Sequence, residues 1–187
     1  SEEVILNVTP ITSLVTKVLT ESAGTIDAAA LESSVTIIKN ALNITEEQLE
    51  QDFIQENNAN VTKIVTQLET TTQSLSAAID DSNITEDKIL DSIVNEIIET
   101  NNVVDFSNST NITNIITQVE ADNTITITNN IKLNVALLIS QVNTKVQIIA
   151  EDINRSFKDI VTESTQLSVA TNNILTATGE NAINLDD

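Results

Sequence analysis

The sequence predicts an all-α protein, a bundle of about six or seven helices with a long helix near the C-terminus. Apolar residues make up 40% of the 187 residues, and they recur at spacings of three and four, as on one face of a helix. Only two glycines and one proline are present, which is too few for the many tight turns of a sandwich or barrel. Asn-[Val/Ile]-Thr triplets recur near the apolar stripes, where they supply a turn residue, an apolar residue and a helix cap.

The length suggests one helical domain over residues 1–187. Its first segment, residues 1–8 (SEEVILNV), places Val4, Leu6 and Val8 on one side of an extended chain. We interpret it as a minor strand, or as the tail of a preceding β domain. The chain begins at Ser1 without Met, as we expect of a mature chain or an excised domain.

The first helix begins at Thr9-Pro10, because Thr suits the N-cap and Pro suits the first helical position. It should end near Ala23-Gly24. Its stripe consists of Ile11, Leu14, Val15, Val18 and Leu19.

Two further helices are expected over residues 26–42 and 58–79. The first has a stripe of Leu31, Val35, Ile38 and Leu42, and the second begins in an Asn-rich run. Between them, Thr45 and Gln48 match a capping box, with Ile44 and Leu49 at the positions of a hydrophobic staple.

The same design returns at residues 83–93, where Thr85 is the expected cap, and Ile84 and Ile89 form the staple pair. A break is expected at Asn101-Asn102, followed by a connector over residues 103–107. Another helix is predicted over residues 110–121.

Residues 124–128 (TITIT) alternate with period two. They form either a short strand, which could pair with residues 4–8, or a helical stretch without a stripe. From residue 130 to residue 160 the helical spacing is continuous, which predicts a single long helix as the spine of the bundle. A weaker helical continuation follows, and Gly179 should stop it before a polar tail at residues 180–187.

The net charge of −20 argues against a nucleic-acid partner and against binding to anionic membranes, since both require clustered Lys and Arg. The longest apolar run, residues 135–139, is far shorter than a membrane span, so no membrane insertion is expected. The chain contains no Cys and no His, which removes thiol nucleophiles, imidazole bases and the usual zinc ligands.

No cofactor is expected, although an acidic surface leaves weak calcium binding open. Residues 80–87 (DDSNITED) space Asp81, Asn83, Thr85 and Asp87 by two, as in the first half of a calcium loop. Glu86 stands where such a loop needs glycine, so an acidic helix start is the better interpretation.

The sequence gives little indication of catalysis or of glycosylation. The acidic pairs all fall at predicted solvated helix starts and no catalytic motif is present, so we expect the protein not to be an enzyme. Seven Asn-x-Ser/Thr triplets occur, against about five expected by chance from the composition. Glycosylation is therefore not indicated.

Residues 7–19 (NVTPITSLVTKVL) resemble the V-T-P-L-T-T-L helix start of helical modules in large bacterial surface and secreted proteins. Ile11 and Ser13 depart from the commoner Leu and Thr. The resemblance covers residues 3 to about 80. It includes residues 41–53 (ALNITEEQLEQDF), where Asn43 stands in a place that is commonly glycine. It implies an extracellular or cell-surface role in adhesion, and no catalytic residues.

The expected function is therefore a non-catalytic structural or adhesive module, whose partners are other copies of itself or neighbouring domains of a surface protein. Val4, Leu6 and Val8 are the candidate interaction residues, since an exposed strand could add to a neighbour's sheet and build a filament. The alternative is a helical module that binds a ligand or peptide, as a sensor or receptor does. Buried Thr or Asn on the helical stripes would favour that alternative.

Overall fold

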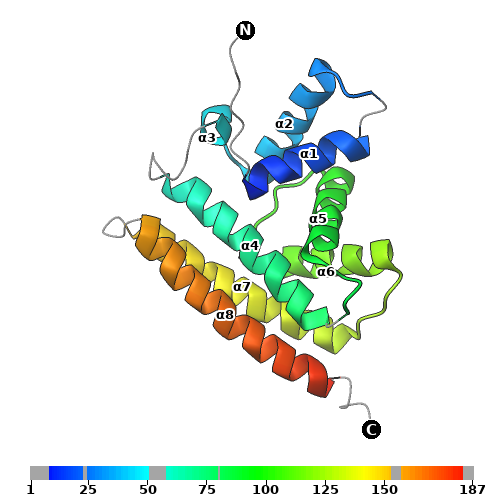
Figure 1. Ribbon diagram of the computed structural model, residues 1–187, viewed down its shortest axis with the longest axis vertical. Coiled ribbons are helices and arrows are strands. Elements are labelled where there is room, and N and C mark those ends of the chain that lie inside the picture. Colours follow the sequence, from blue (N-terminus) through cyan, green and yellow to red (C-terminus); the bar gives the residue numbers. More distant parts are fainter. Residues whose placement is uncertain (1–8, 23–24, 51–57, 80, 153–156, 183–187) are drawn as a thin grey trace.

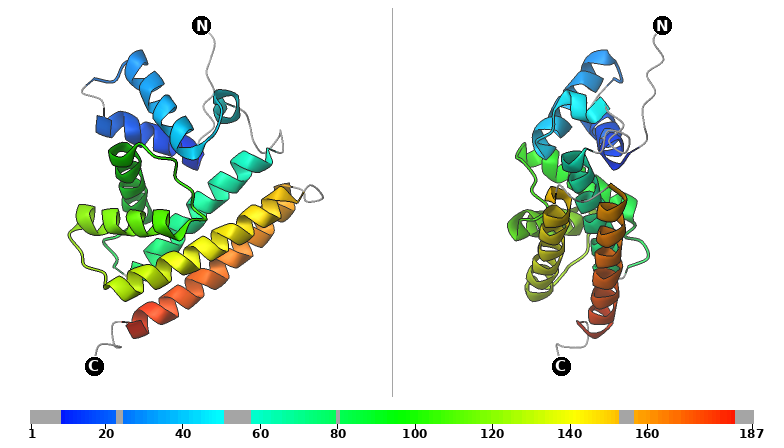
Figure 2. Two further views of the ribbon diagram at one scale, coloured as in Figure 1. Left: turned by 180° about the vertical axis from the view of Figure 1, so that it is seen from behind. Right: turned by 90° about the vertical axis from the view of Figure 1, so that its left-hand side faces the viewer.

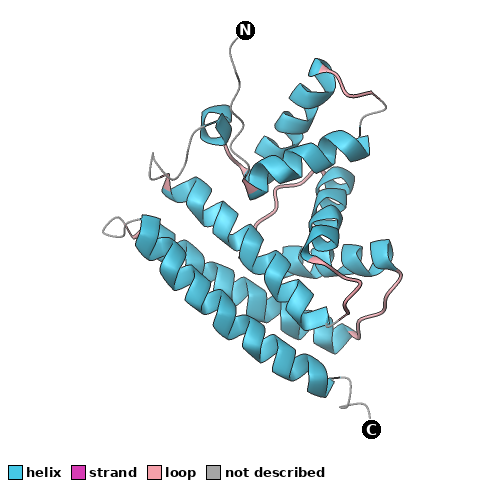
Figure 3. Ribbon diagram, in the orientation of Figure 1, coloured by secondary structure: helices cyan, strands magenta, loops and turns pink. Residues whose placement is uncertain are grey.

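A computed structural model describes residues 9–22, 25–50, 58–79, 81–152 and 157–182. Within these ranges the chain forms eight helices and no strand (Figure 3), which confirms the predicted all-α class. The helices are α1 (Pro10–Ser22), α2 (Ala28–Leu42), α3 (Glu46–Glu50), α4 (Ala59–Ile79), α5 (Glu86–Thr100), α6 (Ser109–Asn123), α7 (Asn129–Glu151) and α8 (Phe157–Ala182).

The three longest helices, α4, α7 and α8, lie side by side along one side of the molecule (Figure 1). Helix α7 runs antiparallel to α4 and α8. Helix α6 packs against α7, and α5 packs against α6. Helices α1 and α2 contact each other and cover the end of α5, as the two further views show (Figure 2). The bundle thus has a long three-helix side and a smaller group of crossed helices.

The predicted helix starts at Thr9, Thr45 and Thr85 are confirmed. The amide N–H of Thr12 donates to Thr9 Oγ1 at 3.2 Å. Thr45 and Gln48 form a reciprocal capping box, with distances of 3.0 and 3.2 Å. At the third start, the N–H of Lys88 donates to Thr85 Oγ1 at 3.4 Å. Local capping chemistry therefore sets these boundaries.

The start of α2 and one residue of its stripe were predicted wrongly. Asp27 caps the helix by accepting from the N–H of Ala30 at 2.9 Å, so α2 begins after Ile26 instead of at it. Leu31 is 44% exposed, whereas Ser34 is buried. The other three residues of the expected stripe do face the core, since Ile38 and Leu42 are buried and Val35 packs against the core cluster.

The long helix predicted over residues 130–160 is two helices, α7 and α8, and this prediction was wrong. Asp152 leaves the helical conformation, with φ −74° and ψ 103°. A straight helix of that length would extend about 46 Å, and its far end would lack a partner. Folding back brings the two halves into contact with each other and places both on α4.

Residues 125–128 form neither a strand nor a helix. The N–H groups of Ile125 and Ile127 donate to the carbonyl oxygen and to the carboxylate of Glu120, at 3.2 and 2.7 Å. These two bonds use the amides that a strand would need for pairing. Helix α8 continues through Gly179 to Ala182, so the expected stop at that glycine is also wrong. The remainder of the expected tail, residues 183–187, lies outside the described residues.

One apolar core cluster joins α1, α2, α4, α5, α6 and the first half of α7. Phe106 lies buried in the connector between α5 and α6, and the N–H of Val104 in this connector donates to the carbonyl of Ala41 at 2.8 Å. The connector thereby fastens the end of α2 to the centre of the bundle. The largest fully buried side chains are Phe106, Ile11, Leu14, Ile38, Leu68, Leu75, Ile89, Ile93, Ile97, Ile112, Ile115 and Ile116.

Candidate functional site

The most distinctive chemistry in the described residues is a buried polar group where α4 meets α7. Asn143 of α7 is fully buried. Its amide nitrogen donates to Thr71 Oγ1 and to the carbonyl of Phe106, both at 2.9 Å. Gln67 Nε2 donates to the backbone carbonyl of Asn143 at 2.9 Å. We call Gln67, Thr71 and Asn143 the polar core group.

These hydrogen bonds join three separate parts of the chain. Thr71 Oγ1 also donates to the carbonyl of Gln67 at 2.8 Å, so its hydroxyl both donates and accepts. The Phe106 carbonyl belongs to the connector between α5 and α6, and its bond to Asn143 fixes this connector against α7. Hydrogen bonds of this kind depend on direction, so they favour one alignment of α4 and α7 over shifted alignments.

Two buried side-chain atoms in the described residues have no hydrogen-bond partner, Asn143 Oδ1 and Ser164 Oγ. A buried acceptor or hydroxyl without a partner destabilises the fold by about 1–3 kcal/mol. The polar core group therefore retains an acceptor that its own members do not use.

The interface between α4 and α8 is also polar. Ser74 Oγ donates to Asn172 Oδ1 at 2.8 Å, and Ser168 Oγ donates to Gln73 Oε1 at 3.3 Å. Ile160 is the buried apolar residue of α8 within residues 158–173. The remaining buried side chains of this part of α8 are Ser164, Ser168 and Thr171. Small hydroxyl residues thus allow α8 to lie close along α4.

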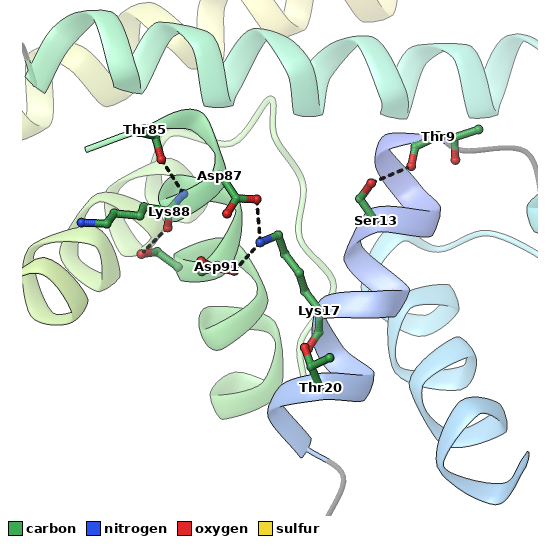
Figure 4. Close-up of polar contacts among 9 residues, drawn as sticks. Thr9, Ser13, Lys17, Thr20, Thr85, Asp87, Lys88 and Asp91 are labelled. Carbon is green, nitrogen blue, oxygen red and sulfur yellow. Dashed lines mark hydrogen bonds and ion pairs between the residues drawn. The ribbon is translucent and has the colours of Figure 1, made fainter. Parts of the chain in front are cut away.

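An ion-pair cluster links α1 to α5 on the other side of the molecule. Lys17 Nζ lies 2.8 Å from Asp87 Oδ1 and 2.5 Å from Asp91 Oδ1 (Figure 4). Burial lowers the pKa of Lys17, but the hydrogen bonds and charges of Asp87 and Asp91 outweigh that effect and leave this pKa raised. The cluster is an interhelical contact that joins α1 to the first two turns of α5.

A second ion pair holds the loop between α6 and α7. Lys132 Nζ contacts Glu120 Oε2, and both side chains are mostly buried. Glu120 also accepts from the N–H of Ile127, so one carboxylate fixes both the loop and the first turn of α7. Salt should therefore weaken this pair less than it weakens exposed pairs.

The residues of the calcium-like segment are engaged with their neighbours. Asp81 Oδ1 accepts from the N–H and from the side-chain amide of Asn83, at 2.8 and 2.9 Å. Thr85 caps α5, and Asp87 contacts Lys17. The described part of the chain contains no group of three or more Asp, Glu, His or Cys residues that could hold a metal ion. Weak calcium binding stays a prediction.

The interaction residues that we predicted, Val4, Leu6 and Val8, lie outside the described residues, so their role stays a prediction. Sequence reasoning missed the polar core group. Gln67 and Thr71 stand among the apolar residues of α4, and Asn143 stands on the stripe of α7 next to Val142. An amide in line with an apolar stripe is the signal that could have found them.

Among the described helices, α7 alone is long and apolar enough for a membrane span by length and composition. This is weak support for such a role, because the core helix of a soluble bundle meets the same criteria. Helix α7 contacts α4, α6 and α8 and carries Asn143 at its centre. No protein-family model, curated protein or solved structure matches the chain.

Proposed function

We propose that the chain is a non-catalytic structural or adhesive module of a bacterial surface or secreted protein. Its partners would be copies of itself or neighbouring domains, and its place would be outside the cell. The resemblance of residues 7–19 to helical modules of such proteins supports this role. In this role the chain holds a fixed shape between the domains or copies on either side of it.

The polar core group is the observation that carries the proposal. Gln67, Thr71 and Asn143 direct their hydrogen bonds at one another and at the Phe106 carbonyl, across α4, α7 and a connector. Buried polar groups used in this way hold helices in one alignment. A module that transmits position or tension between neighbouring domains needs such an alignment.

Self-assembly would use residues 4–8. An extended segment with Val4, Leu6 and Val8 on one side can add to the edge of a neighbouring sheet through its backbone, while its side chains provide specificity. The described residues contain no strand, so the sheet edge would be supplied by a neighbouring domain or by residues outside the described ranges. Copies joined head to tail in this way would form an open chain of subunits instead of a closed ring.

Light scattering on the purified chain at physiological salt, with and without millimolar calcium, tests this proposal. Growth to high mass that is abolished by deleting residues 1–8 would support the filament. Leu6→Pro should abolish growth as well, since Pro removes a backbone donor from the added strand, and Leu6→Val should retain it. A mass that never exceeds a few chains would remove the filament and leave the adhesive module.

A ligand-binding module is the second candidate, and a specific observation favours it. Thr71 and Asn143 are buried on helical stripes, and Asn143 Oδ1 has no hydrogen-bond partner. A small polar ligand that donates to this oxygen would use an acceptor that the fold leaves free. Thermal unfolding in the presence of a panel of amino acids and small polyols tests the idea, because a true ligand raises the midpoint with its concentration. An increase that persists in Asn143→Leu, which removes the acceptor oxygen, would argue against this site.

A further inference from the structure

The charge of the chain is unevenly distributed. Residues 129–182, which form α7, α8 and their connection, carry a net charge of −1, while the remainder of the chain carries −19. Between residues 133 and 150 the only charged side chain is Lys145. Between residues 160 and 173 the only one is Glu163. The hairpin of α7 and α8 is therefore nearly uncharged within a strongly acidic protein.

Exposed aliphatic side chains gather on the same hairpin. Leu137 is 50% exposed and Ile148 is 63% exposed, and both lie on α7. With Leu133 they fall within about 60° of arc on a helix of 3.6 residues per turn, so they form one stripe. Of the large aliphatic residues exposed within the described ranges, most are on the hairpin: Leu133, Leu137, Ile148, Val161 and Val169. We call the exposed side of α7 that carries Leu133, Leu137 and Ile148 the hairpin face.

We propose that the hairpin face is a dimerisation surface, which a second copy of this chain covers with its own hairpin face. Like charges repel any contact that brings together two acidic parts of two copies. The hairpin face lies on the nearly uncharged part of the chain, and it carries the exposed aliphatic residues Leu133, Leu137 and Ile148.

The polar residues of the face suit a copy of itself. Gln141 and Thr144 are exposed between Leu137 and Ile148. An amide or a hydroxyl is both a donor and an acceptor, so such residues can pair across a two-fold axis, where each surface meets its own copy. A face with a surplus of one charge could not do this.

The stripe also has the shape of a helix-packing seam. From Leu133 to Ile148 it runs about 22 Å along α7, and two copies of α7 that cross at a two-fold axis would each cover the stripe of the other. A lipid surface is a poorer match, because Gln141, Thr144 and Lys145 interrupt the stripe and the net charge offers no attraction to anionic lipids.

Sedimentation equilibrium over a range of concentrations from micromolar to near-millimolar tests the proposal. We expect the mass to rise from one chain of 20.2 kDa to two. The double variant Leu137→Glu, Ile148→Glu should remain a single chain at concentrations at least tenfold above the parent's midpoint. The matched control is Ile26→Glu, Val103→Glu, which adds the same charge at residues that are 72% and 59% exposed away from the hairpin. It should dimerise like the parent.

A second measurement does not depend on how the charged variants fold. The chain has no cysteine, so Gln141→Cys introduces a single thiol at the centre of the hairpin face. Mild oxidation should convert most of it to a disulfide-linked dimer. Ala121→Cys, which places an exposed thiol on α6, should form far less of this dimer.

Three results would overturn the proposal. The parent could remain a single chain at every concentration, or the control variant could lose dimerisation as fully as the Leu137/Ile148 variant. The chain could also bind neutral phosphatidylcholine vesicles through Leu137 and Ile148 without dimerising, which would assign the face to lipid. Deleting residues 1–8 should leave the dimer intact, so this test is independent of the filament.

Discussion

The buried amide of Asn143 links three parts of the bundle through hydrogen bonds. Its side chain reaches Thr71 on one helix and the Phe106 carbonyl in a connector, and its own carbonyl accepts from Gln67. These contacts link residues more than thirty and more than seventy positions apart in the sequence. An apolar residue of similar size could fill the space, but it would leave the Phe106 carbonyl without its donor.

Replacing Asn143 by Ala should therefore destabilise the protein. We expect a loss of about 2–4 kcal/mol, which combines the unpaired Phe106 carbonyl with a small cavity. Thr144→Ala, one residue along and exposed, is the matched control and should change stability by less than about 0.5 kcal/mol. Urea unfolding followed by circular dichroism at 222 nm measures both. Equal losses in the two variants would contradict the assigned role.

Glu96 gives a prediction for the dependence of stability on pH. Burial raises its pKa, a hydrogen bond from Asn114 lowers it in part, and the charge of Glu99 raises it further. An acid whose pKa is higher in the folded state than in the unfolded state binds its proton more tightly when folded. Its contribution thus favours folding at pH below the ordinary value of 4.5 and disfavours folding once the pH rises through the raised pKa.

We therefore expect Glu96→Gln to raise the thermal midpoint at pH 7 and to leave it little changed near pH 4. The exposed Glu32 offers a charge-matched control, since Glu32→Gln removes the same charge from a solvated position. Melting curves at half-unit pH steps distinguish the two variants. A gain that is equal at all pH values would contradict the titration of Glu96 as its source.

At the scale of elements, the helix ends show which conformations the sequence tolerates. Helices α2, α5 and α6 each end in a residue with the left-handed conformation, and none of the three is glycine: Asn43 at φ 52°, Asn101 at φ 50° and Thr124 at φ 56°. Asparagine adopts this conformation readily, whereas a β-branched residue is strained in it. The left-handed conformation of Asn43 is also the one that glycine adopts most easily.

Thr124→Gly should consequently stabilise the protein. Removing the strain of a β-branched side chain is worth about 1–2 kcal/mol, and the added freedom of glycine in the unfolded chain reduces the net gain to about 0.5–1 kcal/mol. Asn101→Gly should be close to neutral. The control Thr126→Gly lies in the same loop without a positive φ and should give no gain. Chemical unfolding of the three variants would test whether Thr124→Gly alone increases the free energy of unfolding.

Sequence patterns predicted elements best where the signal is local. Thr9-Pro10, Thr45 with Gln48, and Thr85 each set a helix start through bonds to residues three positions away. The division between α7 and α8 was missed because no glycine or proline marks it. It depends on α4 being available for both halves to pack against. The polar core group was missed for the same reason, since its partners are far apart in sequence.

At the scale of the whole molecule, the net charge of −20 dominates the behaviour in solution. Self-repulsion among the acidic side chains destabilises the folded state, while the mostly buried pair of Lys132 and Glu120 is shielded from salt. The ion pairs of Lys17 with Asp87 and Asp91 are more exposed. We expect their stabilisation of the fold to be smaller than the destabilisation caused by repulsion among the acidic side chains.

Raising sodium chloride from 10 mM to 0.5 M should therefore raise the thermal midpoint by several degrees. Added salt shortens the Debye length and so weakens the repulsion between acidic side chains. Most of the increase should occur below about 0.15 M, where the Debye length has already fallen to about 8 Å, whereas an effect of salt exclusion unrelated to charge grows steadily with concentration. A midpoint that falls with salt would mean that the ion pairs outweigh the repulsion.

The hydroxyl-rich contact between α4 and α8 also bears on how the protein is made. Ser74 and its partner Asn172 are 98 positions apart, and a ribosome adds about 5–20 residues per second. The side of α4 that packs against α8 therefore stays exposed to water for roughly 5–20 s, until α8 has been synthesised. Threonine and serine on that side remain hydrated during the wait, whereas leucines would offer a nascent chain a site for aggregation. Replacing Thr70 and Ser74 by Leu should accordingly increase aggregation during synthesis, even if the folded variant is as stable as the parent.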